Sequence, residues 1–236
     1  QRLSARGLAL LAPFDVNAQE AADAVQPETT ISWNSKAAGT PVEAQDWMVV
    51  AANPLAAQAG AKILQRGGTA ADAMVAVQAL LGLVEPQSSG LGGGAFLVWY
   101  DRESGALTTL DGRETAPAAV TPRLFQNENG EPLKFWDAVV GGRSVGVPGT
   151  PALMERAHQK WGNQNWAGLL APAKSLAEDG FVVSPRLAGL VARDAERLAL
   201  SQATASYFLP DGVPITAGTV LKNPEYARTL AQFAKS

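Results

Sequence analysis

The chain has 236 residues, 47% of them hydrophobic, which is enough to build one large domain or two small ones around a substantial core. Nineteen basic and twenty-two acidic residues leave a formal charge of −3, and the scattered lysines and arginines exclude a basic surface for nucleic acid. The absence of cysteine excludes disulfides, thiolate metal sites and a cysteine nucleophile.

Residues 1–47 are expected to form an N-terminal arm. Arg2 and Arg6 precede the apolar segment Leu8–Phe14, and Ala22-Asp23-Ala24 has the small-x-small pattern of a signal-peptidase site. Two interpretations remain open for this arm: the remnant of an export signal, or an extended surface segment.

Residues 48–236 contain no linker or repeat, so they are expected to belong to one domain. In the first half, capping residues and hydrophobic periodicity predict a strand over Met48–Ala52, helices over Leu55–Arg66 and Ala70–Leu83, and hairpin strands over Phe96–Asp101 and Ala106–Leu110. The second helix is apolar almost all round and should be central. The longest apolar stretch, Ala73–Val84, is shorter than the roughly 20 residues that a membrane-spanning helix needs.

The second half is predicted to be mainly helical. Its predicted elements are a strand over Ser144–Val147 and helices over Pro151–Lys160 (capped by Thr150), Trp166–Asp179, Pro185–Leu200 and from Pro224 toward Phe233. Helices before and after a strand hairpin indicate an α+β fold with layers of both types, not a βαβ array.

The glycine cluster Gly90–Ala95 satisfies the dinucleotide pattern G-x-G-x-x-A. A nucleotide site needs a strand before this pattern and a helix after it, whereas here the order is reversed. The glycines are therefore expected to let two sheet layers, or a ligand, approach the backbone closely. Ser88 and Ser89 lie outside any G-x-S-x-G elbow and are expected to make turn and capping hydrogen bonds.

His158 is the only histidine, so any Ser-His-Asp arrangement would need it. It falls late in a helix, where a positive side chain suits the helix dipole, and a surface role is expected. One histidine, no cysteine and widely spaced carboxylates argue against a metal site. No cofactor is expected either.

Arg113 follows the second hairpin strand, at a position where scaffolds often present binding groups. Its guanidinium is a permanently charged planar fork that matches a carboxylate. From the residues alone, an ordinary ion pair with Asp111 or Glu114 remains the alternative.

The segments SSGLGGGAFLVWYD, LDGRETAPAAVTPRLF and SVGVPGT resemble the large chain of the gamma-glutamyltransferases. The resemblance extends from Met48 to Phe233 and implies the four-layer α/β/β/α fold of the N-terminal-nucleophile hydrolases, of which this chain would supply part. In that family the arginine of the DGRETAP motif binds the α-carboxylate of the γ-glutamyl donor. The resemblance implies this role for Arg113, and we expect Glu114 to orient it.

The resemblance also implies a partner, the small chain cut from the same precursor. Its N-terminal threonine would attack the γ-glutamyl amide of glutathione or a related donor, with its own amine as base. Water or an amino acid or dipeptide would then accept the glutamyl group. This chain begins at Gln1 and is shorter than a typical large chain, so we expect no catalytic residue in it and no activity without the small chain.

Two alternative functions remain open. One is a related acylase that removes a glutaryl side chain from a β-lactam, and the other is a relative that binds without catalysis. A periplasmic or secreted location is expected.

Overall fold

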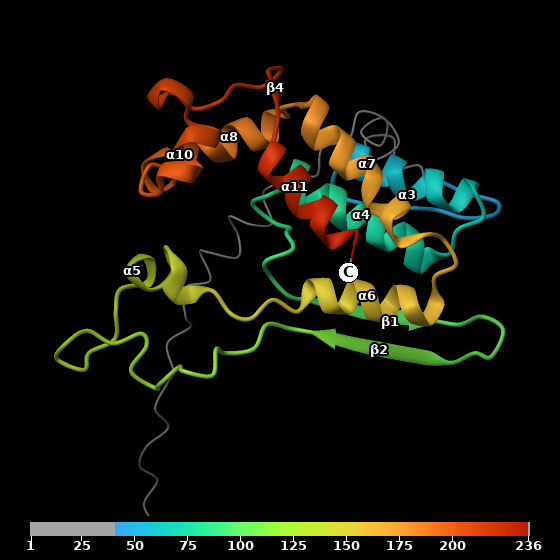
Figure 1. The fold of residues 1–236 in the computed structure, drawn as a ribbon, viewed down its shortest axis with the longest axis horizontal. Helices are drawn as coiled ribbons and strands as arrows, with labels where there is room; N and C mark the ends of the chain where they lie inside the picture. Colours follow the sequence, from blue (N-terminus) through green and yellow to red (C-terminus); the bar gives the residue numbers. More distant parts are fainter. Residues whose placement is uncertain (1–40, 236) are drawn as a thin grey trace, which may run out of the picture.

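The computed structural model describes residues 41–235 (Figure 1). The proposed export-signal remnant lies outside the described residues. Of the predicted arm, residues 41–47 are described, and they are exposed and lie outside any helix or strand.

The described residues form helices and two short two-stranded antiparallel sheets, of which the first is a hairpin. The α-helices are α3 (Pro54–Gln65), α4 (Ala70–Val84), α5 (Phe135–Val139), α6 (Thr150–Trp161), α7 (Trp166–Asp179), α8 (Pro185–Arg193), α9 (Ala195–Leu198), α10 (Gln202–Phe208) and α11 (Pro224–Phe233). The strands are β1 (Ala95–Tyr100), β2 (Leu107–Gly112), β3 (Phe181–Val182) and β4 (Val220–Leu221), and the 3-10 turns are η1 (Gly142–Ser144) and η2 (Pro210–Gly212). None of the described helices is long and apolar enough to cross a membrane.

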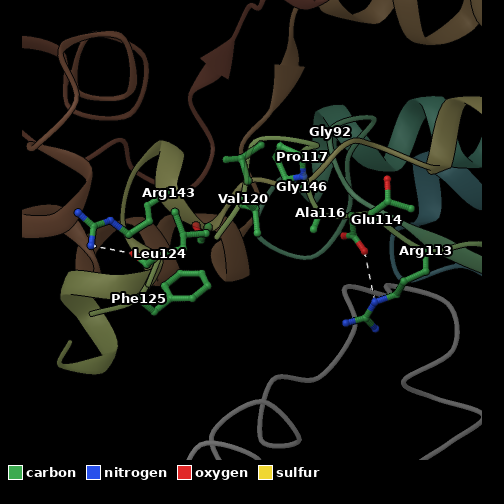
Figure 2. Close-up of a pocket in the computed structure, with 13 residues that line it drawn as sticks. Gly92, Arg113, Glu114, Ala116, Pro117, Val120, Leu124, Phe125, Arg143 and Gly146 are labelled. Atoms are coloured by element: carbon green, nitrogen blue, oxygen red, sulfur yellow. Dashed lines mark hydrogen bonds and ion pairs between the residues drawn. The ribbon is translucent and has the colours of Figure 1, made fainter. Parts of the chain in front are cut away.

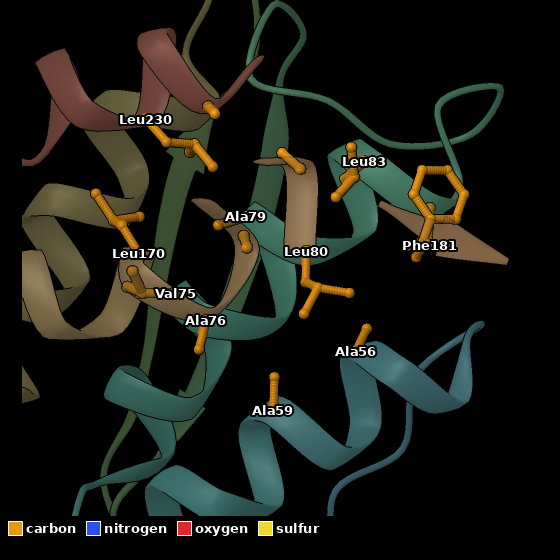
Figure 3. Packing of buried hydrophobic residues seen from close by; sticks show 14 of the residues in the cluster. Ala56, Ala59, Val75, Ala76, Ala79, Leu80, Leu83, Leu170, Phe181 and Leu230 are labelled. Atoms are coloured by element: carbon orange, nitrogen blue, oxygen red, sulfur yellow. The ribbon is translucent and has the colours of Figure 1, made fainter. Parts of the chain in front are cut away.

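Helix α4 is the centre of the core, as its apolar sequence predicts. It contacts α3, α6 and α7, and α7 in turn contacts α11. Val75 and Ala79 are completely buried. Figure 3 shows Leu80 of α4 directed toward Ala56 and Ala59 of α3. Small side chains on both helices allow this close packing, which excludes water from a largely aliphatic interior.

A buried carboxylate fixes the start of α4. Asp72 completes a capping box with Thr69, whose backbone N–H lies 2.8 Å from Asp72 Oδ2. The same oxygen accepts the backbone N–H of Asn163 at 3.1 Å, and His158 Nε2 lies 3.6 Å from Oδ1. The surface role expected for His158 is therefore wrong, since its side chain is 19% exposed and Nε2 lies 2.8 Å from the Gln164 carbonyl oxygen.

The β1–β2 hairpin has one covered face and one open face. Helix α6 lies along the covered face (Figure 1). There Trp99 stacks on Trp161 with ring centres 4.6 Å apart. The alternation of the strand places Phe96, Val98 and Tyr100 on the other face, where they are exposed. The register sets Val98 opposite Thr109 and Tyr100 opposite Leu107, so this face continues onto β2.

Two predicted strands are wrong. Met48–Ala52 forms no strand, because it pairs with no other backbone segment of the described chain. Ser144–Val147 also forms no strand: the 3-10 turn η1 ends at Ser144, and only Val147 pairs, in a single bridge to Thr115. A short apolar run becomes a strand only where a neighbouring edge offers hydrogen bonds.

Two helix boundaries also differ from the predicted ones. Thr150 lies inside α6 rather than capping it, and Gly149 holds the N-cap position without a side-chain hydrogen bond. The backbone N–H groups of Gly149 and Thr150 instead both donate to the Gly93 carbonyl at 3.1 Å. The helix predicted over Pro185–Leu200 is divided at Asp194, which ends α8 and begins α9.

Candidate functional site

Arg113 lies directly after β2, as predicted, and its side chain is 70% exposed. Its Nε lies 3.5 Å from Glu114 Oε2. The carboxylate of Asp111 accepts the backbone N–H of Arg113 at 2.9 Å, which stabilises the turn out of the strand. The guanidinium is therefore held beside one carboxylate and still faces solvent.

An open cleft of about 490 Å³ extends from Arg113 (Figure 2). Its lining residues are Gly92, Arg113, Glu114, Thr115, Ala116, Pro117, Val120, Leu124, Phe125, Arg143, Ser144, Val145 and Gly146. Two lining residues carry positive charge and one carries negative charge, so the cleft favours an anionic group.

Arg143 is the second cation and was not identified from the sequence. It lies at the opposite end of the cleft from Arg113, and its Nη1 donates to the Leu124 carbonyl at 3.1 Å (Figure 2). No sequence motif marks it. Its place in the cleft depends on the pairing of Thr115 with Val147, which brings the two segments together.

Glu114 lies between this cleft and a second one of about 450 Å³. The second cleft is lined by Gln78, Pro86, Ser88, Ser89, Gly90, Gly92, Gly93, Gly94 and Glu114. The Glu114 side chain is 36% exposed, so its carboxylate remains accessible while neighbouring backbone limits its movement.

The glycine cluster permits this placement of Glu114. A Cβ added at Gly94 would lie 2.5 Å from Glu114 Oε2, and one added at Gly146 would lie 2.9 Å from Glu114 Cβ. The predicted order of helix, glycine cluster and strand is confirmed, since α4 precedes the cluster and β1 follows it. The group that approaches the glycine backbone is the Glu114 side chain, not the second sheet layer or the ligand that the sequence predicted.

The two serines before the cluster make the expected turn contacts. The backbone N–H groups of Ser88 and Ser89 donate to the Glu85 carbonyl at 3.0 Å, and Ser89 Oγ accepts a hydrogen bond from Gln78 Nε2 at 2.9 Å. His158 lines neither cleft. Among residues 41–235, no group of three or more histidine, aspartate or glutamate side chains is arranged to hold a metal ion.

Known proteins share these sequence and structural features. A family model described as gamma-glutamyltranspeptidase matches residues 56–236. A glutathione hydrolase proenzyme of Bacillus subtilis (strain 168) is 42% identical over 185 residues, which cover 78% of this chain and 31% of that protein. The chain thus spans about a third of the length of this curated relative.

Solved structures show the same relationship. The gamma-glutamyltranspeptidase of Helicobacter pylori superposes with a TM-score of 0.79 at 32% identity, over 83% of this chain and 56% of that one. A cephalosporin acylase from Bacillus halodurans superposes with a TM-score of 0.64 at 33% identity, over 77% of this chain and 34% of that one.

The fold is therefore that of the N-terminal-nucleophile hydrolases, an α+β sandwich of which this chain supplies part. Within that class, the chain belongs to the gamma-glutamyltranspeptidase family.

Proposed function

We propose that this chain provides the donor-carboxylate site of an enzyme that transfers the γ-glutamyl group of glutathione or a related compound to water, an amino acid or a dipeptide. The observation that carries this proposal is Arg113, an exposed guanidinium at the end of a cleft and beside Glu114. A fork of N–H donors with a fixed charge suits the α-carboxylate of a glutamyl donor. Glu114, 3.5 Å from Arg113 Nε, would orient that fork.

The reacting groups come from a partner chain cut from the same precursor. Its N-terminal threonine hydroxyl attacks the γ-carbonyl carbon while the threonine α-amine takes the hydroxyl proton. That proton passes to the departing amine as the amide C–N bond breaks, which leaves an ester between the glutamyl group and threonine. Water or an acceptor amine then attacks this ester and regenerates the hydroxyl. Arg113 keeps the donor in place through both steps.

The open face of the β1–β2 hairpin is the surface on which the partner chain packs. Phe96, Val98 and Tyr100 are each more than half exposed there, an apolar patch that a soluble domain normally covers. Because α6 already covers the opposite face, a second sheet would complete the sandwich. The arrangement of residues 48–236 as part of one domain shared between two chains belongs to this proposal.

The test is substitution of Arg113 in the complex of this chain with its partner. Arg113→Ala is expected to raise KM for γ-glutamyl donors by more than tenfold, because a hydrogen bond to a charged group contributes about 1.5–3 kcal/mol. Arg113→Lys should recover only part of the loss, because an ammonium group cannot form the fork. An unchanged KM in Arg113→Ala would remove this side chain from the donor site.

A glutaryl acylase is the second candidate, since a guanidinium also binds the terminal carboxylate of a glutaryl group and the Bacillus halodurans acylase shares the fold. The two donors differ in the α-amino group. Comparing kcat/KM for a γ-glutamyl amide and the matching glutaryl amide decides between them, and the transferase predicts a preference for the γ-glutamyl compound.

Periplasmic or secreted location also forms part of the proposal. Its support is the basic, apolar and small-residue pattern within residues 1–30, so N-terminal sequencing of the mature protein would test it. Sequencing the partner chain would show whether it begins with threonine, and any other first residue would indicate a relative without catalysis.

A further inference from the structure

Glu85 is a buried carboxylate outside the donor cleft. It follows the last residue of α4 and is 1% exposed. Its side chain accepts hydrogen bonds from Asn53 Nδ2 at 3.1 Å, Gln87 Nε2 at 2.6 Å and Arg186 Nη1 at 2.5 Å. A buried charge is tolerated only when it is paired and hydrogen-bonded in this way. One carboxylate thus joins the N-cap of α3, the segment after α4 and the first turn of α8.

The backbone of Glu85 holds the same segment. Its carbonyl oxygen accepts the N–H groups of Ser88 and Ser89 at 3.0 Å. The loop Pro86–Gly94 therefore begins with its first residues attached to both the side chain and the backbone of Glu85. Further along, residues of this loop line the second cleft together with Glu114.

The end of the loop determines the room available to Glu114. Gly94 leaves no space for a side chain beside the Glu114 carboxylate, and the Gly93 carbonyl accepts hydrogen bonds from the start of α6 at 3.1 Å. A shift of the loop would therefore displace Glu114 or open a gap behind it. Either change alters the group that lies 3.5 Å from Arg113 Nε.

Resting on the γ-glutamyl activity proposed above, we propose that Glu85 is a positioning residue for the donor site. It fixes the Pro86–Gly94 loop, the loop confines Glu114, and Glu114 orients Arg113. Stability alone is a weak explanation for the ion pair with Arg186. Apolar residues of similar volume often stabilise a core by as much as a buried ion pair does. The contacts with the loop explain why a charged anchor lies at this point.

The experiment uses the complex with the partner chain and measures both kinetics and thermal unfolding. Glu85→Gln is expected to raise KM for a γ-glutamyl donor about tenfold, because it weakens charged hydrogen bonds that hold the loop. Gln87→Ala leaves the ion pair with Arg186 intact and should raise KM about threefold without lowering the unfolding temperature. Glu178→Gln, the same chemical change in an exposed ion pair of α7, is the control and should alter neither quantity.

A double-mutant cycle separates positioning from a purely structural role. In the Glu114→Gln background, Glu85→Gln should have little further effect on KM, because the route from Glu85 to Arg113 is already interrupted. Additive effects on KM would overturn the inference. So would a lower unfolding temperature in Glu85→Gln with an unchanged KM. If Glu85→Gln does not fold, Gln87→Ala decides, and an unchanged KM in that variant overturns the inference.

Failure of the proposed function would be recognised separately, as a wild-type complex that does not turn over γ-glutamyl donors. In that case the dissociation constant of L-glutamate is measured by calorimetry for the wild type, Glu85→Gln, Glu114→Gln and the double variant. L-Glutamate carries the α-carboxylate but does not react. Non-additive losses of binding in Glu85→Gln and Glu114→Gln would support the positioning role, and independent losses would overturn it.

Discussion

The position of the Glu114 side chain beside Arg113 is limited more by the space its neighbours leave than by charge. Glu114 lies against the backbone of the glycine cluster on one side and Gly146 on the other. The DGRETAP motif indicates the charged pair, and the distant glycines provide the space in which that pair can form. A carboxylate confined in this way needs little reordering to orient a neighbouring guanidinium.

Gly94→Ala is the sharpest test of this constraint. The new Cβ would lie 2.5 Å from Glu114 Oε2 and 2.8 Å from the Glu114 backbone nitrogen, so the side chain and its backbone must move. We expect KM for γ-glutamyl donors to rise about tenfold, since overpacking a tight contact costs about 1–3 kcal/mol. Gly189→Ala in α8 is the matched control, because its Cβ would meet no atom within 4 Å. Equal kinetics for the two variants would show that Glu114 has more room than its neighbours indicate.

At the scale of elements, polar groups at helix ends connect the helical layers. Asp72 caps the first turn of α4 and also accepts a hydrogen bond from the segment between α6 and α7. On the other side of α4, the hydroxyl of Tyr226 in α11 donates to the Ala79 carbonyl at 2.7 Å. These contacts set the relative placement of helices whose apolar faces are built largely from interchangeable alanines and leucines.

Asp72→Ala is expected to destabilise the protein by about 2–4 kcal/mol, since it removes the capping box and leaves buried N–H donors without their acceptor. The free energy of unfolding in urea measures the loss. Asp179→Ala at the exposed end of α7 is the control and should change stability by less than about 0.5 kcal/mol. A similar effect in both variants would contradict the assigned role of Asp72.

Stability should also fall at alkaline pH. Burial raises the pKa of the Tyr226 hydroxyl above its ordinary value of 10.0, and burial raises the pKa of Tyr207 to about 12. Because each tyrosine has a higher pKa in the folded state than in the unfolded state, its protonated hydroxyl contributes to the free energy of unfolding. That contribution is complete below about pH 10, the unfolded-state pKa, and is lost as the pH rises through the folded-state pKa. Tyr226→Phe should flatten this dependence in part while costing about 0.5–1.5 kcal/mol at neutral pH for the lost hydrogen bond. The free energy of unfolding should be measured from pH 8 to 11 for both proteins. If Tyr226 contributes nothing, it will depend on pH with the same slope in Tyr226→Phe as in the wild type.

At the scale of the whole molecule, the described chain lacks a cover for its hairpin. The helical layers bury most of α4, whereas the outer face of β1 and β2 carries exposed aromatic and aliphatic side chains. The chain spans 31% of the length of its Bacillus subtilis relative. The proposed function assigns the uncovered face of the hairpin to the partner chain.

Val98→Asp should therefore weaken association with the partner chain. Burying a valine contributes about 1.5–3 kcal/mol, and a buried unpaired carboxylate adds a further penalty. Co-purification of the two chains measures the effect. Val182→Asp is the control, because Val182 is comparably exposed, at 61% against 68%, but lies on β3, away from the hairpin. Intact complexes with Val98→Asp would show that this face is not the contact surface.

Local sequence determined most of the helices. Capping residues and proline predicted α3, α7 and α11 within one or two residues of their observed ends. Helix ends depend on contacts within a few positions of the chain, so they can be recognised from the chain itself. The role proposed for Arg113 and Glu114 came from the resemblance of the DGRETAP motif to a family, since the residues alone left an ordinary ion pair as the alternative.

Only the tertiary structure decided which distant residues meet. The contact of Gly94 with Glu114, the cleft position of Arg143, the burial of His158 beside Asp72 and the network around Glu85 all join segments far apart in sequence. Short runs such as Met48–Ala52 failed as predicted strands for the same reason, because strand formation requires a partner that the run does not contain.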